Sequence, residues 1–347
     1  MTPLRPASAP DGPVARLTSP GDIAAAVPVL CGFVPHESLV LVSLRGPRRR
    51  VGLTARIDLD DADRPMLAEL AERLRRDGAD RALVVVVTEE PGHRPRADVV
   101  AGVRRALRRV GTVPEEQLLV RGGRWWSYAC DGPCCPPGGT PVPEGGGAGL
   151  VAAARALGGR AVLPSREALV AGVAPPEGAA ARRAAARLLA ASSARAREVA
   201  RSGRVVVGRA ALQAWRGALR GVADGVGPAD AAALVVALED VVVRDEVLTA
   251  VLEDGPALVA LLHLLAAQAV PPHDAAVCAA LGWAAHAEDD GALARVALER
   301  ALRVDPRHGL ARLGRDALDG QVPPADLRAV LADARTVLRQ QHPWTVP

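Results

Sequence analysis

The sequence changes its periodicity once, and this change limits the possible folds more than any other feature. Up to residue 129, apolar strand-like runs alternate with amphipathic helix-like runs. The strand-like segments are 38–44, 51–59 and 81–90, and the helix-like segments are 64–79 and 96–111. From residue 175 onwards the patterns are only helical. We therefore predict an α/β domain followed by an all-α domain.

The order of the segments in the α/β domain predicts its sheet. Only a short turn separates the first two strands, so we expect them to form an antiparallel hairpin. Two further short strands are expected on either side of Gly122–Gly123. Because the remaining strands alternate with helices, which is typical of parallel strands, the prediction is a mostly parallel sheet with an antiparallel hairpin. Ser19 and Pro20 are expected to begin a helix before the first strand, as the N-cap and the first helical residue.

The domain limits are placed where the composition changes. Residues 130–149 are rich in Pro and Gly and have no periodicity, which is typical of a connecting segment. The expected parts are a disordered lead-in at 1–14, the α/β domain at 15–145, a Pro/Gly-rich transition at 146–174, the helical domain at 175–340 and a tail at 341–347.

Residues 277–306 of the helical domain have the spacing of a tetratricopeptide repeat. The residues that carry this spacing are Leu281, Gly282, Ala294, Leu298, Ala301 and Pro306. Small residues at such positions let two helices pack closely, and the proline ends the pair. Since we find one repeat and no array, two interpretations stay open: a tetratricopeptide-like helical hairpin, or an ordinary hairpin within a larger helical domain.

The composition excludes several mechanisms. Hydrophobic residues make up 49% of the chain but aromatic residues only 2%, so the cores must be built from Ala, Val and Leu. The chain contains neither Lys nor Asn. Without Lys there is no Walker A lysine and no Schiff base with pyridoxal phosphate. The exclusive use of Arg indicates a coding bias, which weakens any functional interpretation of Arg clusters.

Charge and hydropathy indicate the compartment and the class of partner. The formal net charge of +4 is small for 347 residues, so we expect neither nucleic acid nor an anionic membrane as a partner. The arginines at 48–50, and those at 104, 105, 108 and 109, are expected to be solvated rather than bound to phosphates. The N-terminal sequence lacks an apolar signal region, and the longest apolar run, 257–270, is too short to cross a bilayer. Five unevenly spaced Cys do not resemble a secreted disulfide framework, so a soluble cytoplasmic protein is predicted.

The segment RWWSYACDGPCCPPGGTPVP (124–143) is the first candidate site. It contains Cys130, Cys134 and Cys135 in the pattern C-x3-C-C. Zinc sites usually pair their ligands as C-x2-C and need four of them, so no metal or other cofactor is predicted. Structural zinc and a redox disulfide between Cys130 and Cys134 remain alternatives to a structural loop that buries small thiols.

Alternation along a predicted strand gives the second candidate site. Thr54, Arg56 and Asp58 share one face of the strand 51–59, and Glu89 and Glu90 end the strand 81–90. Converging carboxylates could act as acid and base or hold Mg²⁺, which makes Arg56, Asp58 and Glu89 candidate catalytic residues. The alternative is an Arg–Asp pair on a solvated strand. Arg244 and Asp245, in the segment VVVRDEVL, are expected to form a helix-start or interhelical pair.

The order of these segments resembles the actinobacterial "domain of unknown function 4192" family over nearly the whole chain. The matching stretches are Pro20-Gly21-Asp22, VPVLCGFVPHESLVLVSL, ARIDL, RWWSYACDGPCCPPGGTPV, AVLPSREAL, VVVRDEVL and GALARVALERALRVDP. One departure is that WAAHAEDDGALA is more acidic here than the family's usual glycine-containing turn. The resemblance supports the two-domain architecture and implies no established activity.

Two classes of function are consistent with the sequence. No recognised catalytic motif is present, so the leading expectation is a non-catalytic interaction or regulatory protein whose partner is a protein. The alternative is an enzyme or small-ligand binder with its site at the strand ends beside the Cys130–Cys135 loop. A broad groove on the helices would favour the first class, and a pocket lined by Asp58, Glu89 and Cys130 the second.

Overall fold

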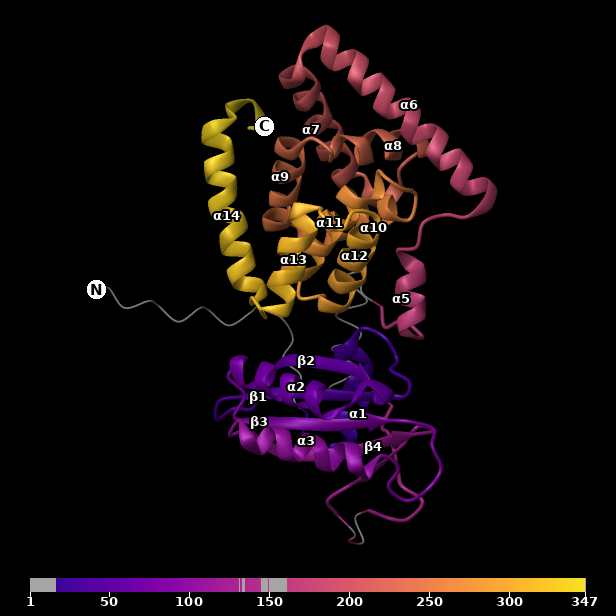
Figure 1. Cartoon of the computed structure of the whole chain (residues 1–347), viewed down its shortest axis with the longest axis vertical. Helices are drawn as coiled ribbons and strands as arrows, with labels where there is room; N and C mark the ends of the chain where they lie inside the picture. Colours follow the sequence, from indigo (N-terminus) through magenta and orange to yellow (C-terminus); the bar gives the residue numbers. More distant parts are fainter. Residues whose placement is uncertain (1–16, 131, 133–134, 145–148, 150–160, 347) are drawn as a thin grey trace, which may run out of the picture. The chain divides into compact units, whose positions relative to one another are not determined.

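The computed structural model describes residues 17–130, 132, 135–144, 149 and 161–346 (Figure 1). Its contacts divide the chain into two units, Met1–Ser165 and Arg166–Pro347. This division falls inside the predicted transition, 146–174. The predicted lead-in at 1–14 and much of that transition lie outside the described residues, so the predicted domain limits stay predictions.

The described residues of the first unit form a six-stranded mixed sheet. Its strands are β1 (Ser38–Arg45), β2 (Arg50–Asp58), β3 (Arg81–Val87), β4 (Val113–Arg121), β5 (Arg124–Ser127) and β6 (Thr140–Pro141). Their order in the sheet is β2-β1-β3-β4-β5-β6. The predicted hairpins β1–β2 and β4–β5 are confirmed, and Gly122 and Gly123 between β4 and β5 have φ values of 52° and 70°.

The prediction of a mostly parallel sheet is wrong. Among the strands that the structure describes, only β3 and β4 pair in parallel, and every other neighbouring pair is antiparallel. The reason is that β1, the inner strand of the first hairpin, pairs antiparallel with β3. The helix between β2 and β3 therefore connects two strands that run in the same direction but are separated by β1, and only the helix between β3 and β4 connects parallel strands that are neighbours.

Helices cover this sheet. They are α1 (Pro20–Cys31), the 3-10 helix η1 (Leu59–Asp61), α2 (Arg64–Arg76) and α3 (Ala97–Arg109). Ser19 is the N-cap of α1, as predicted, and its side chain accepts a hydrogen bond from the backbone N–H of Asp22 at 3.1 Å. Side chains of one sheet face, among them Leu39, Val86 and Leu119, pack with α2 and α3 (Figure 1). Val40, Val85 and Leu118 lie on the opposite face, and α1 contacts β2 and β4.

The described part of the second unit consists of helices packed around α11. They are α5 (Arg166–Gly172), α6 (Gly178–Ser202), α7 (Arg204–Arg220), η2 (Val222–Asp224), α8 (Pro228–Ala237), α9 (Val241–Thr249), α10 (Val251–Ala266), α11 (Asp274–Ala287), α12 (Gly291–Val304), α13 (Gly309–Asp319), α14 (Pro324–Gln341) and η3 (Pro343–Thr345). All residues of α11 except Trp283 are buried, and its neighbours include α9, α10, α12, α13 and α14. A helix that is buried on nearly every side belongs at the centre of a helical domain, as α11 does here (Figure 1).

Leu298 is the contact point of α11, α12 and α13. A Cβ atom on Gly282 of α11 would lie 2.4 Å from Leu298 Cγ and 3.2 Å from the Ala294 carbonyl oxygen. A Cβ atom on Gly314 of α13 would lie 2.9 Å from Leu298 Cδ2. Both glycines are thus required by close packing, and Leu298 itself is completely buried.

A buried ion pair joins four segments of the helical unit. Arg300 on α12 and Asp274 on α11 have side chains that are 4% and 1% exposed, and Arg300 Nη2 lies 2.9 Å from Asp274 Oδ2. The same guanidinium donates hydrogen bonds to the carbonyls of Ala266 and Ala269, both at 2.8 Å, and to that of Val173. Since each carbonyl ends a different turn or helix, Arg300 connects the ends of α5 and α10 to α11 and α12.

None of the helices formed by the described residues is, by itself, both long and apolar enough to cross a membrane. The consecutive helices α9 and α10 have a sufficient length and composition only together, and they are bent by 110° with respect to each other.

Candidate functional site

Arg56 and Asp58, the candidate residues of β2, form hydrogen bonds and an ion pair within the sheet. Arg56 Nε donates to Ser38 Oγ on β1 at 2.8 Å, and its Nη2 lies 2.7 Å from Asp58 Oδ1. The guanidinium also lies over the Phe33 ring, 5.9 Å from its centroid. Arg56 therefore fastens β2 to β1, and the Arg–Asp pair is the arrangement expected of a structural contact.

The carboxylates at the end of β3 each have their own partner. Glu89 Oε1 accepts a hydrogen bond from the Gly122 N–H at 3.2 Å. Glu90 is paired with Arg96, whose guanidinium also binds Asp60 at 3.1 Å. These contacts fix turns around the sheet, and they leave Glu89 and Asp58 in separate interactions rather than as a joint acid–base pair.

The Cys-containing segment is attached to β5 by its backbone. Trp126 Nε1 donates to the Pro137 carbonyl at 3.0 Å, and Arg124 donates to the carbonyls of Gly138 and Gly139 at 2.6 and 2.9 Å. Cys130 Sγ accepts from the Gly132 N–H at 3.4 Å, whereas Cys134 lies outside the described residues. Among the residues that the structure describes, no three His, Cys, Asp or Glu side chains form a group that could hold a metal ion.

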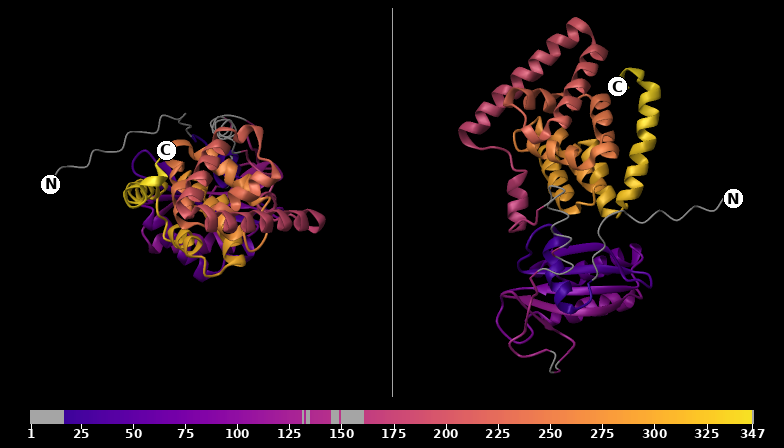
Figure 2. Two further views of the ribbon diagram at one scale, coloured as in Figure 1. Left: turned by 90° about the horizontal axis from the view of Figure 1, so that it is seen from above. Right: turned by 180° about the vertical axis from the view of Figure 1, so that it is seen from behind.

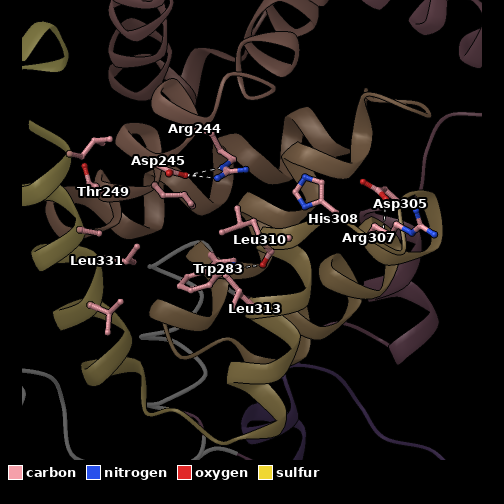
Figure 3. Close-up of a pocket in the computed structure, with 15 residues that line it drawn as sticks. Arg244, Asp245, Thr249, Trp283, Asp305, Arg307, His308, Leu310, Leu313 and Leu331 are labelled. Atoms are coloured by element: carbon pink, nitrogen blue, oxygen red, sulfur yellow. Dashed lines mark hydrogen bonds and ion pairs between the residues drawn. The ribbon is translucent and has the colours of Figure 1, made fainter. Parts of the chain in front are cut away.

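The helical unit contains a cavity of about 640 Å³ between α9, α11, α13 and α14 (Figure 3). We call it the α13–α14 groove. Its apolar lining consists of Leu248, Trp283, Leu310, Leu313, Val330, Leu331, Ala334 and Leu338. Its polar end consists of Arg244, Asp245, Asp305, Arg307 and His308. A mainly apolar cavity of this size with a few polar groups at one end is typical of a binding site.

Asp240 begins the helix that carries Arg244. As the N-cap of α9, Asp240 accepts hydrogen bonds from the N–H groups of Val242 and Val243. Although burial tends to raise the pKa of Asp240, its hydrogen bonds and its contact with Arg204 outweigh this effect and hold that pKa below its usual value. One turn into α9, Arg244 bonds through Nε and Nη2 to Asp245 Oδ1 at 2.9 and 2.7 Å, so the two residues form a pair within one helix.

His308 is held by the start of α13. It is the N-cap of that helix, and its Nδ1 accepts a hydrogen bond from the Ala311 N–H at 3.3 Å. The neutral ring must then carry its proton on Nε2, the other nitrogen. Burial, and next the positive charge of Arg244, lower the pKa of His308 below 6.5, and Asp305 opposes this shift only in part. Near neutral pH His308 is therefore an uncharged hydrogen-bond donor.

The lining of the groove suits binding better than covalent catalysis. The only hydroxyl among the lining residues belongs to Thr249, and it donates to the Glu246 carbonyl of its own helix at 2.8 Å. Trp283 Nε1 is likewise occupied, by the Leu310 carbonyl at 2.8 Å. The polar groups that line the cavity and retain bonding capacity are the guanidinium of Arg307, part of that of Arg244, the His308 ring and the Oδ2 atoms of Asp245 and Asp305.

Most of these residues have no recognisable signal in the sequence. The sequence indicates Arg244 and Asp245 as a pair, but it does not indicate His308, Trp283 or the walls of the groove. The only local signal for His308 is its place after Asp305-Pro306, which ends one helical pattern, and before the amphipathic segment 309–319. The walls come from segments up to 90 residues apart, which periodicity alone does not bring together.

The titration of His308 makes the stability of the helical unit depend on pH. The folded pKa lies below the unfolded value near 6.5, so the unfolded chain binds the proton first as the pH falls. We therefore expect the stability of this unit to be highest above pH 6.5 and to decrease below it, by at most about 1.4 kcal/mol per pH unit for this one group.

Replacing His308 with Asn, which is a good N-cap, should make the decrease shallower in urea denaturation between pH 7.5 and 5.5. His286, whose pKa burial also lowers, is unchanged in that variant and supplies the remaining slope. An identical pH dependence in both proteins would contradict the assignment.

The comparisons with known proteins address the family and not the activity. A family model described as "Domain of unknown function (DUF4192)" matches residues 20–325, which include the sheet, the groove residues up to Leu313 and the ion pair Arg300–Asp274. Neither a search of curated proteins nor a search of solved structures produced a match. Because the family model covers most of the 347 residues, the chain belongs to the DUF4192 family.

Proposed function

We propose that this protein is a non-catalytic cytoplasmic interaction protein. Its α13–α14 groove binds an amphipathic segment of a partner protein that carries a carboxylate near one end. The segment lies along the groove, with its apolar side chains against the leucines and its carboxylate at Arg307, Arg244 and His308.

The observation that carries this proposal is the exposure of aliphatic side chains on both walls of the groove. Leu313 on α13 is 61% exposed and Val330 on α14 is 55% exposed, and both line the cavity. Val337, two turns after Val330 on the same helix, is 50% exposed. Large apolar side chains that flank a groove and remain exposed favour a protein segment laid across them, as in helix-in-groove recognition.

The polar end carries two Arg and two Asp and has no net charge, so the arginines, and not the total charge, indicate which group of a partner would bind there. Among the described residues, the guanidinium of Arg307 makes no ion pair, and that of Arg244 pairs only with the adjacent Asp245. Both arginines and His308 line the same end of the cavity (Figure 3). A carboxylate is the group that arginine binds with the best geometry, so an acidic residue of the partner is the complement of this end.

The packing of α11 and α12 supports a tetratricopeptide-like interpretation of this hairpin. Gly282 lies against Leu298 and Ala294, which are positions that the repeat spacing assigns to close helix packing. The following helices α13 and α14 form the groove walls, so the hairpin supplies a base on which the binding surface is built.

The alternative function, an enzyme or small-ligand binder at the strand ends, is less well supported. Arg56, Asp58 and Glu89 are occupied by contacts within the sheet and its turns. A small molecule is the alternative occupant of the groove, since about 640 Å³ lies within the range of small-ligand cavities.

The proposal predicts which peptides the protein selects. A displayed library of 16-residue amphipathic peptides should yield sequences with aliphatic residues at helical spacing and Asp or Glu near one end. Fluorescence anisotropy should give affinities that fall at least about 30-fold in the Leu313→Glu and Val330→Glu variants, since each places a charge on an apolar wall. Arg307→Glu should reverse the preference and select peptides with a basic end.

Val206→Glu is the matched control, because Val206 is 58% exposed and does not line the groove. It should leave peptide affinity unchanged. Peptides that bind equally well to the groove variants, or a library that yields no groove-dependent binder, would refute the proposal. An organic acid retained by the purified protein in native mass spectrometry, and lost in Leu313→Glu, would assign the groove to a small molecule instead.

A further inference from the structure

The helices α6 and α7 concentrate positive charge that the net charge of the whole chain conceals. Residues 178–220 contain ten Arg and a single Glu, giving a net charge of +9, whereas the complete chain carries +4. A coding bias explains why these residues are Arg rather than Lys. It does not explain the scarcity of acidic residues here, because the chain has 39 Asp and Glu in total.

The arginines of α6 lie on one side of the helix. At 100° per residue, five of them fall within an arc of about 140°, centred roughly opposite the buried Ala184 and Leu188. They are Arg182, Arg183, Arg187, Arg197 and Arg201. From the first to the last they extend along about 29 Å of helix. In Figure 1 and Figure 2, α6 lies along the outer margin of the helical unit, and all of these arginines except Arg187, which is half-buried, are exposed.

These arginines are not used to stabilise the fold. Among the described residues, the guanidinium groups of Arg182, Arg183, Arg187 and Arg197 have no ion pair or hydrogen bond, and only Arg201 has a carboxylate partner, Glu198. Elsewhere in this unit arginines join helices: Arg195 and Arg204 both bind Asp240. Four unpaired like charges on one helix repel one another, and this repulsion is relieved by an extended polyanion.

The residues between the arginines indicate which polyanion fits. The outward face of α6 otherwise presents small side chains, such as Ala186, Ala190 and Ser193. A helix that binds a membrane surface needs several large apolar side chains beside its basic ones, whereas α6 has a single one at the edge of this face, Leu189, which is 66% exposed. Small side chains instead keep the helix narrow, close to the width of about 12 Å that the major groove of DNA provides.

We propose that the outward face of α6 binds the phosphates of double-stranded DNA without reading the base sequence. This departs from the expectation based on total charge, because the sum over the chain hides a separate basic face. The proposal is independent of the α13–α14 groove, which no residue of α6 lines.

The test measures DNA affinity as a function of salt. Full-length protein is titrated into a labelled 30-base-pair duplex of arbitrary sequence between 50 and 200 mM NaCl, with anisotropy as the readout. Dissociation constants in the micromolar range are expected. The logarithm of the association constant should fall with the logarithm of the salt concentration with a slope of about −4, which corresponds to four or five phosphate contacts. The variant R182Q/R183Q/R187Q/R197Q should lose most of that slope, about 3 to 4 units, and at least about 30-fold in affinity at the lowest salt.

Two further variants distinguish DNA binding by the outward face of α6 from an effect of the protein's total positive charge. R104Q/R105Q/R108Q/R109Q removes four positive charges from α3 and should keep the affinity within about threefold. Replacing the four α6 arginines with Lys retains the charges and should retain binding. Gln and Lys are good helix formers at exposed positions, so unchanged thermal melting should accompany all three variants.

Equal losses of DNA affinity in the α3 and α6 glutamine variants would show that binding depends only on the net charge of the protein, and this would overturn the proposal. Wild-type binding that the α6 variant leaves intact would do the same. Tighter binding to vesicles of phosphatidylglycerol than to the duplex, with the same dependence on α6, would assign the face to a membrane.

Discussion

Replacing Arg300 with methionine is expected to destabilise the helical unit by about 3 to 5 kcal/mol. The substitution leaves the carboxylate of Asp274, which is 1% exposed, without its counter-ion in the interior. It also removes the donors that bind the carbonyls of Val173, Ala266 and Ala269. Urea denaturation followed by circular dichroism should show the corresponding shift of the midpoint, on the order of 1 M or more for a typical slope.

The double variant Arg300→Met with Asp274→Leu lacks both members of the ion pair. Removing both charges leaves no unpaired carboxylate, so the double variant should be more stable than Arg300→Met alone. Arg339→Met is a useful comparison, because Arg339 binds the buried Glu246 at 2.6 Å but is itself 29% exposed, and it should cost less. A loss below about 1 kcal/mol for Arg300→Met would show that the pair is not important for the fold.

The other large effect is expected from Gly282→Leu, at about 3 kcal/mol of destabilisation. The new side chain would occupy the space of Leu298, whose Cδ2 atom is also in close contact with Gly314 of α13, so Leu298 has little room to move. In an ordinary helix the same change is stabilising, since leucine is a much better helix former than glycine. The sign of the effect therefore reports packing and not propensity, and thermal denaturation is sufficient to measure it.

Gly217→Leu in α7 is the matched control, because a Cβ atom at that position would meet nothing within 4 Å. It should be neutral or slightly stabilising. Adding Leu298→Ala to Gly282→Leu should restore part of the lost stability by making room for the new side chain. Equal effects of the two glycine substitutions would indicate that α11 and α12 are not closely packed at this point.

The parts of the fold that were predicted correctly depend on local signals. The N-cap Ser19, the hairpin β1–β2 and the turn Gly122–Gly123 each involve residues close together in the sequence. The strand order was not predictable in this way. Whether β3 lies beside β1 or β2 is decided by which apolar faces pack together, and both choices are compatible with the same strand and helix pattern.

Local sequence signals predict even less of the candidate site than of the fold. Arg56, Asp58 and Glu89 were grouped because they lie on strands that were expected to end together, but local partners occupy each of them. The groove, by contrast, depends on α11 bringing α9, α13 and α14 to one place. Its leucines have the ordinary spacing of core residues in the sequence, and only the packed structure shows that Leu313 remains exposed.

The contact of three helices at Leu298 also has a consequence for how sequences of this family can diverge. Positions 282, 298 and 314 share a single volume, because two glycines on separate helices admit one leucine between them. A larger residue at any one of these positions is compatible with the same helix arrangement only if another becomes smaller. We therefore expect the sizes of these three residues to vary together among relatives, so that their sum changes less than any one of them.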